Sequence, residues 1–176
     1  MKKILVVVDM QKDFVDGALG SKEAVAIVNN VTDKIINFDG DIVVTYDTHP
    51  ENYMETQEGK NLPVPHCIKG TDGWKLDSKV QEAVSKKEFK AITKPTFGST
   101  ELPEYIKTNY NPDEIEIELV GLCTDICVVS NALLLKANFP ETKISVDASC
   151  CAGVTPESHN AALTTMKMCQ INVFGE

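Results

Sequence analysis

The chain has 176 residues, 43% of them hydrophobic, and carries a formal net charge of −9 at pH 7 with a pI of about 4.8. This length suits one domain with a sizeable core, so we expect a single domain over 1–176. The acidic balance argues against nucleic acid or an anionic membrane as partner. The sequence contains no run of about 18 apolar residues, so we expect no membrane span. The apolar run of MKKILVVVDM is too brief for a signal peptide.

The six cysteines have no secretion signal beside them, which indicates reduced thiols and a cytoplasmic protein. No pair has the CxxC spacing of zinc ribbons or thioredoxin-like motifs. Cysteine often serves only as a small buried apolar residue, so a function must be argued separately for each of the six.

Short β-branched runs alternate with helical patterns along the chain. We expect strands at 4–8, 41–46, 89–93, 115–120, 143–147 and 171–174. We expect helices at 21–37 with Ser21 as N-cap, at 76–86, 100–109 and 125–137, and from Pro156 to about 169. This alternation predicts an α/β fold, a Rossmann-like three-layer sandwich with about six mostly parallel strands and helices on both faces. The polar connection at 47–75 is longer than most loops in compact domains, which indicates a functional segment.

Chemically active side chains follow four of these strands in succession. Asp9 ends the first strand, Asp47 and His49 end the second, and Lys94 ends the third. GLCTDIC, at 121–127, follows the fourth. In open parallel sheets, ligands bind beyond the carboxyl ends of the strands. The sequence therefore predicts one site at this edge of the sheet.

Cys123 and Cys127 lie one helical turn apart in GLCTDICVVSN. They could be two buried apolar residues, a redox pair, half of a metal site or the seat of a nucleophile. Thr124 or Asp125 can cap the following helix, which places Cys127 in its first turn. The positive helix end stabilises a thiolate there, and a nearby lysine would lower the thiol pKa further. Cys127 is the better nucleophile, and Cys123 is better placed to offer its backbone amide to an oxyanion.

A second set of residues suits a metal. Asp47 and His49 can point the same way from an extended segment, and His66 adds a second imidazole. Glu58 or Glu55 could supply a fourth ligand. Such a set fits Zn, Fe or Mn.

A nucleophilic cysteine needs a base. If the histidines at 49 and 66 hold metal, only His159 remains, and its place in TPESHNAA indicates a structural or solvated side chain. The base is then a carboxylate, and Asp9 is the one that ends a strand beside the other groups.

These residues resemble a known family. VVDMQKDF, ITKPTFGS and GLCTDICV are similar to motifs of the isochorismatase and nicotinamidase superfamily of cysteine hydrolases. The resemblance covers most of the chain. It implies a triad of Asp9, Lys94 and Cys127 and a cis peptide at Leu122–Cys123. It also implies an oxyanion site formed by the amides of Cys123 and Cys127.

DTHPENY and LPVPHC resemble the metal-bearing nicotinamidase branch. The resemblance implies Asp47, His49 and His66 as ligands, with Glu58 preferred as the fourth and Zn preferred over Fe or Mn. Many nicotinamidases have a Trp where this chain has Leu62-Pro63, so pocket shape is harder to predict than reaction type. The implied substrate-binding residues are Phe14, Leu19, Phe97 and Leu122.

The resemblance implies hydrolysis of nicotinamide to nicotinate and ammonia through a cysteine thioester. The expected partners are a small amide substrate and further copies of the chain in a homo-oligomer. The nearest competing function is that of another amide or ureide hydrolase of the same superfamily. Outside catalysis, the chain could be a metal-binding or redox-sensing protein, in which Cys123 and Cys127 oxidise together. It could also be an inactive scaffold, against which the intact triad argues.

Overall fold

The computed structural model describes residues 1–176 and contains six strands and seven α-helices. The strands are β1 (Lys2–Val8), β2 (Asp41–Asp47), β3 (Phe89–Lys94), β4 (Ile115–Leu122), β5 (Lys143–Ala152) and β6 (Asn172–Phe174). The helices are α1 (Lys12–Val15), α2 (Lys22–Asn37), α3 (Gln57–Asn61), α4 (Ser78–Ser85), α5 (Glu101–Asn109), α6 (Val129–Asn138) and α7 (Pro156–Met168). Short 3₁₀ turns lie at Tyr53–Glu55 and Pro112–Glu114, and a π-helical turn at Thr124–Val128.

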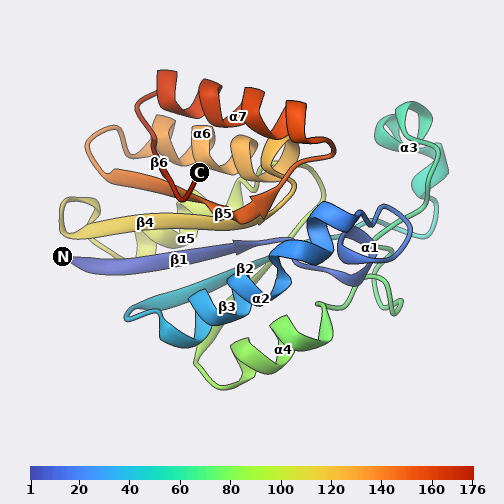
Figure 1. Cartoon of the computed structure of the whole chain (residues 1–176), viewed down its shortest axis with the longest axis horizontal. Coiled ribbons are helices and arrows are strands. Elements are labelled where there is room, and N and C mark those ends of the chain that lie inside the picture. Colours follow the sequence, from blue (N-terminus) through green and yellow to red (C-terminus); the bar gives the residue numbers. More distant parts are fainter.

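The strands form one sheet in the order β3-β2-β1-β4-β5-β6, and every pairing is parallel. The predicted α/β sandwich is confirmed, with a fully parallel sheet. All carboxyl ends therefore point the same way, toward α1 and α3 on the right of Figure 1. The order reverses between β1 and β4, which is where open α/β sheets bind ligands.

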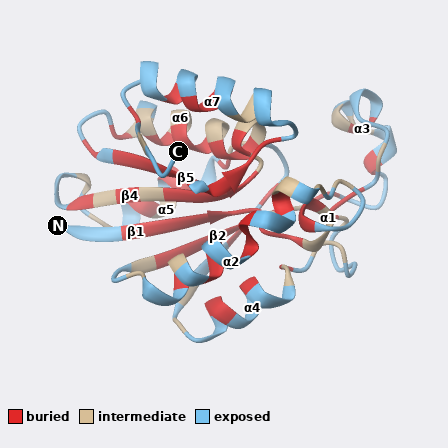
Figure 2. Ribbon diagram, viewed as in Figure 1, coloured by how far each residue is buried: buried red, intermediate tan, exposed pale blue.

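Two apolar cores cover the two faces of the sheet. Alternate residues of β1 explain this arrangement, because neighbouring side chains of a strand point to opposite faces. Ile4 and Val6 pack with α5, α6 and α7, whereas Leu5 and Val7 pack with α1, α2 and α4. The central strands are accordingly the most buried elements in Figure 2. This rigid centre fixes where the strand ends lie.

Most predicted elements are present within a few residues, and the Ser21 hydroxyl caps α2 by accepting from the Ala24 amide. Three features differ from the prediction. The helix α1 was not predicted, because four residues are too few for a periodic pattern to appear. The connection 47–75 contains α3 and a 3₁₀ turn, and the helix predicted from 125 begins as a π turn before α6.

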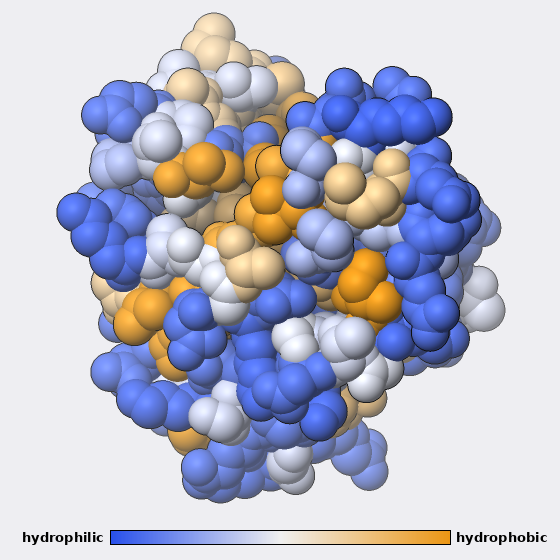
Figure 3. All heavy atoms as spheres, turned by 90° about the vertical axis from the view of Figure 1, so that its right-hand side faces the viewer, coloured by the Kyte–Doolittle hydropathy of each residue, from blue (hydrophilic) through white to orange (hydrophobic).

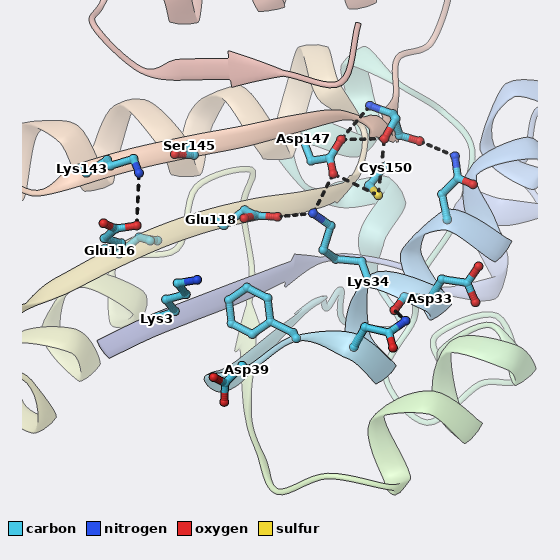
Figure 4. Close-up of a pocket in the computed structure, with 15 residues that line it drawn as sticks. Lys3, Asp33, Lys34, Asp39, Glu116, Glu118, Lys143, Ser145, Asp147 and Cys150 are labelled. Carbon is cyan, nitrogen blue, oxygen red and sulfur yellow. Dashed lines mark hydrogen bonds and ion pairs between the residues drawn. The ribbon is translucent and has the colours of Figure 1, made fainter. Parts of the chain in front are cut away.

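The face of β4 and β5 beside α2 remains open and polar. Figure 4 shows Lys34 reaching from α2 between Glu118 and Asp147, at 2.8 Å from each carboxylate. A wide cavity lies here, away from the carboxyl ends of the strands. Lys34 pairs with Glu118 and Asp147, and Lys143 pairs with Glu116, so we interpret this cavity as a solvated face of the sheet. No helix of the fold has the length and apolarity needed to cross a bilayer.

Candidate active site

The structure brings the predicted residues together at the carboxyl edge of the sheet. Asp9 follows β1, Asp47 ends β2 and Lys94 ends β3, with Asp47 and Lys94 in direct register. Cys127 lies in the turn after β4. All four side chains are buried. Four polar groups excluded from water in one place must be compensated by one another.

Lys94 joins the acid and the cysteine. Its Nζ lies 2.6 Å from Asp9 Oδ2 and donates to Cys127 Sγ at 3.3 Å. The Thr45 hydroxyl donates to the other oxygen of Asp9 at 2.7 Å. Apart from this contact with Lys94, Asp9 Oδ2 has no hydrogen-bond partner. The second lone pair of that oxygen is therefore free to accept a proton.

Burial decides the direction of the pKa shift for Asp9 and Cys127, whereas charge decides it for Lys94. Burial raises the pKa of Asp9, although the Lys94 ammonium lowers it. Burial lowers the pKa of Lys94, but the Asp9 carboxylate overcomes this and the net pKa is raised, so the ammonium stays charged. Burial, followed by the Asp9 charge, raises the pKa of Cys127 well above its usual value, and Lys94 opposes the shift. The predicted effect of lysine is present, but the predicted low thiol pKa is wrong, because dehydration outweighs it.

The turn that carries the cysteines has an unusual backbone. The Leu122–Cys123 peptide is cis, as predicted. Gly121 has φ +118°, and a Cβ there would lie 2.1 Å from the Val8 carbonyl oxygen, so only glycine fits. Cys127 lies in the following π turn, where Val128 N–H bonds Cys123 O at 3.0 Å. Turns of this type are frequent at functional sites.

The predicted caps of this turn are wrong. Cys123 is the N-cap and offers no side-chain bond. The Thr124 hydroxyl instead pairs with His159 Nδ1 at 2.7 Å, and both oxygens of Asp125 accept from the Val154 amide at 3.2 Å. Both side chains thus tie the cysteine turn to the start of α7. His159 is structural, in agreement with the prediction.

The predicted metal ligands also converge. Ligand atoms of Asp47, His49, Glu58 and His66 all lie within 4.8 Å of one another. Asp47 Oδ2 is 2.9 Å from His49 Nε2 and 3.4 Å from His66 Nε2. Two imidazoles and two carboxylates are a donor set that suits Zn, Fe or Mn. These four side chains, called the metal group below, could hold a metal ion.

The surroundings of the group fit that use. His66 Nδ1 lies 2.8 Å from the Val64 carbonyl oxygen, which can only accept, so Nε2 keeps its lone pair toward the cluster. Tyr53 packs edge-on against the rings of both His49 and His66. Glu55 faces away and accepts from Asn52, so Glu58 is the glutamate that joins the group.

Two residues of VVDMQKDF hold the segments that carry the candidate metal ligands in place and were not singled out by the sequence analysis. The buried Gln11 accepts from the Asp47 amide at 2.7 Å and donates to the Asp47 carbonyl at 2.8 Å. Asp13 accepts from the amide of Cys67, the residue after His66, at 2.8 Å. Their spacing on either side of Lys12, directly after the Asp9 strand end, was the available signal.

A small cavity opens between the cysteine and the metal group. Its volume is about 50 Å³. Its lining combines apolar side chains with both sets of polar groups: Phe14, Leu19, Asp47, Glu58, Leu62, His66, Phe97, Cys123, Ile126 and Cys127. Figure 3 looks onto this end of the molecule, where hydrophobic side chains gather within a hydrophilic surround. A mostly apolar lining with a few convergent polar groups is typical of small-molecule sites.

Leu122 and Trp74 do not line the cavity. Leu122 is fully buried in the core on the α2 side, so the structure does not bring this predicted substrate-binding residue to the cavity. Trp74 lies beside Tyr46 and donates its indole N–H to Thr48. The predicted Phe14, Leu19 and Phe97 do line the cavity.

The fold and these side chains define an α/β protein with a buried cysteine beside a candidate metal group. The Isochorismatase domain family matches residues 3–175. The chain therefore belongs to the isochorismatase family of hydrolases.

Similarity to individual proteins is full-length but distant. The chain is 26% identical to the nicotinamidase of Saccharomyces cerevisiae, over 97% of this chain and 98% of the relative. It is 32% identical to an uncharacterised isochorismatase family protein of Bacillus subtilis, over 93% of each. A crystal structure of Bacillus subtilis nicotinamidase superposes with TM-score 0.85 at 26% identity, covering 98% of this chain and 99% of the other. Pyrococcus horikoshii pyrazinamidase in complex with zinc gives 0.79 at 26% identity, with both chains fully covered.

Proposed function

We propose that this hydrolase converts nicotinamide to nicotinate and ammonia through a thioester on Cys127. One arrangement carries the proposal. Lys94 Nζ lies 2.6 Å from Asp9 Oδ2 and 3.3 Å from Cys127 Sγ, and the cavity beside Cys127 is also lined by members of the metal group. Similarity to nicotinamidases and a pyrazinamidase supports the choice of a heteroaromatic amide.

In the first half of the reaction, Asp9 accepts the thiol proton of Cys127. Its raised pKa makes it a stronger base than an ordinary aspartate. The charged Lys94 stabilises the thiolate while it forms. The sulfur then attacks the amide carbon. The backbone amides of Cys123 and Cys127 stabilise the resulting oxyanion, a contribution of about 10²–10³-fold in rate per donor.

Asp9 next returns its proton to the leaving nitrogen. The C–N bond breaks, ammonia departs and an acyl group remains on the Cys127 sulfur. In the second half, Asp9 takes a proton from water, the hydroxide attacks the thioester carbon, and the carboxylic acid leaves. The thiol recovers the proton, so atoms and charges balance.

Asp47, His49, Glu58 and His66 would hold the divalent metal, with Zn preferred. When bound, the metal would accept the lone pair of the pyridine nitrogen and so orient the ring. Phe14, Leu19 and Phe97 would pack on the ring faces. The six cysteines are free thiols, in keeping with the proposed cytoplasmic location.

The test is ammonia release from nicotinamide, with and without added Zn²⁺, Fe²⁺ or Mn²⁺. Wild-type protein should release ammonia, and folded Cys127→Ala should release none. Turnover of a ureide or of an aliphatic amide in preference to nicotinamide would instead support a hydrolase of that other specificity. Normal turnover by Cys127→Ala would eliminate the thioester mechanism.

A further inference from the structure

Asn131 connects the cysteine turn to the opposite wall of the cavity. It lies on α6 one helical turn after Cys127, and its side chain is fully buried. Its Nδ2 donates to Cys127 O at 2.8 Å and to Phe97 O at 3.1 Å, and its Oδ1 accepts from Ser99 N at 2.9 Å. One amide thus spans two segments that both reach the cavity.

We propose that Asn131 is a positioning residue that sets the distance between the Phe97 wall and Cys127, and thereby the width of the substrate cavity. Phe97 and Cys127 both line that cavity. The Phe97 side chain is 43% exposed and sits on a loop after β3, so surrounding packing alone holds it weakly. The three bonds to Asn131 fix this loop against the helix that carries the nucleophile.

The chemistry of the site selects asparagine. Its surroundings present one donor, Ser99 N–H, and two acceptors, the carbonyls of Phe97 and Cys127. A carboxamide offers one acceptor and two donors, so all its partners are satisfied in one orientation. A carboxylate at this position would place an oxygen against two carbonyl oxygens. An apolar side chain would remove all three of these bonds, two of which are buried.

The decisive variant is Asn131→Asp, which keeps the shape and removes both donors. Asn138→Asp is the matched control on the same helix, because Asn138 also donates to a carbonyl one turn back, Leu134 O, and lies far from the cavity. Amide hydrogen exchange over 95–102 should become faster in Asn131→Asp and stay at the wild-type rate in Asn138→Asp. This readout does not depend on any enzymatic activity.

The kinetic readout rests on the proposed function and uses nicotinamide as probe. A loosened wall weakens ground-state and transition-state binding alike, so KM should rise about tenfold while kcat changes little. A purely structural role would lower the amount of active protein without moving KM. On a Phe97→Ala background, Asn131→Asp should raise KM no further, because the wall it positions is absent.

Asn131→Ser provides a second variant if the aspartate prevents folding. A serine hydroxyl can bond the carbonyl one turn back, here Cys127 O, but is too short to reach the loop at 97–99. The same faster exchange and higher KM are expected. Folded variants with wild-type exchange over 95–102 and wild-type KM would overturn the proposal. Absence of ammonia release by wild-type protein, with faster exchange in the variants, would refute only the proposed function.

Discussion

The ammonium of Lys94 lies 2.6 Å from the carboxylate of Asp9, and water reaches neither side chain. Each charge therefore depends on the other for compensation. Removing one partner of a buried ion pair leaves an uncompensated charge, whereas replacing both leaves none. The same contact should then determine both folding stability and activity, and the two effects can be separated.

Lys94→Met should lower the free energy of unfolding by about 3–5 kcal/mol, because it strands the Asp9 carboxylate. The double variant Asp9→Asn/Lys94→Met should recover much of this loss. Both should be inactive toward nicotinamide. Urea unfolding and ammonia release measure the two effects. A double variant that is less stable than Lys94→Met would contradict the assignment of a buried charge pair.

The Cys127 thiol should react slowly with iodoacetamide at pH 7, because its raised pKa leaves little thiolate. Its reaction rate should increase as pH rises. Asp9→Asn removes the carboxylate that raises this pKa and leaves Lys94 free to stabilise the thiolate. The variant should therefore be alkylated faster than wild type, with its pH profile displaced to lower pH, while amide turnover is lost.

Mass spectrometry of the Cys127 peptide measures this rate, and the exposed Cys169 serves as internal control, since its rate should be equal in both proteins. Slower alkylation of Cys127 in Asp9→Asn would show that the carboxylate does not oppose thiolate formation.

Glu58 and Glu55 offer a matched pair for the metal group. Glu58 Oε1 lies 3.6 Å from His49 Nε2, whereas Glu55 accepts from Asn52 at the surface. Glu58→Gln should weaken Zn²⁺ binding by about tenfold or more, and Glu55→Gln should leave it unchanged. Competition with a chromophoric chelator measures the affinity. An equal effect of the two substitutions would remove Glu58 from the ligand set.

Much of the fold and site could be predicted because their signals are local. The β-branched runs indicate the strands, and parallel strands bring their carboxyl ends to one edge. Asp9, Asp47 and Lys94 therefore meet by topology alone. The assignment of unlike roles to Cys123 and Cys127 rests on position relative to one turn, which is also a local property.

The remaining features depend on packing between distant segments. The thiol pKa is set by complete burial, which a sequence does not display. Thr124 and Asp125 have capping chemistry, but α7 and the loop before it offer partners 35 and 29 residues away. In the sequence, Asn131 is a polar residue in a mostly apolar helix, and only the folded loop at 97–99 shows its partners.

Gln11 should act on metal binding without touching the metal. Gln11→Glu keeps the acceptor for the Asp47 amide but places oxygen against the carbonyls of Asp47 and Trp74. Because supporting residues of this type tune metal sites, Zn²⁺ affinity should fall about 10–100-fold. Gln81→Glu on the exposed face of α4 is the control and should bind Zn²⁺ like wild type. Equal affinities of the two variants would exclude a role for Gln11 in orienting Asp47.

The bond between Thr124 and His159 predicts energetic coupling between the cysteine turn and α7. Thr124→Val keeps the shape, removes the hydroxyl and leaves the His159 ring without its 2.7 Å partner. His159→Phe should cost about 1–3 kcal/mol, since it leaves the buried Thr124 hydroxyl unpaired. Thr124→Val should cost less, since the His159 ring is only partly buried and water can replace the lost partner. The double variant should cost less than the sum by about 0.5–3 kcal/mol, as expected for residues in direct contact. Urea unfolding of the four proteins gives this coupling energy. Strict additivity would mean that the bond does not hold the turn, and the position of Cys127 would then depend on Asp125 and the π turn alone.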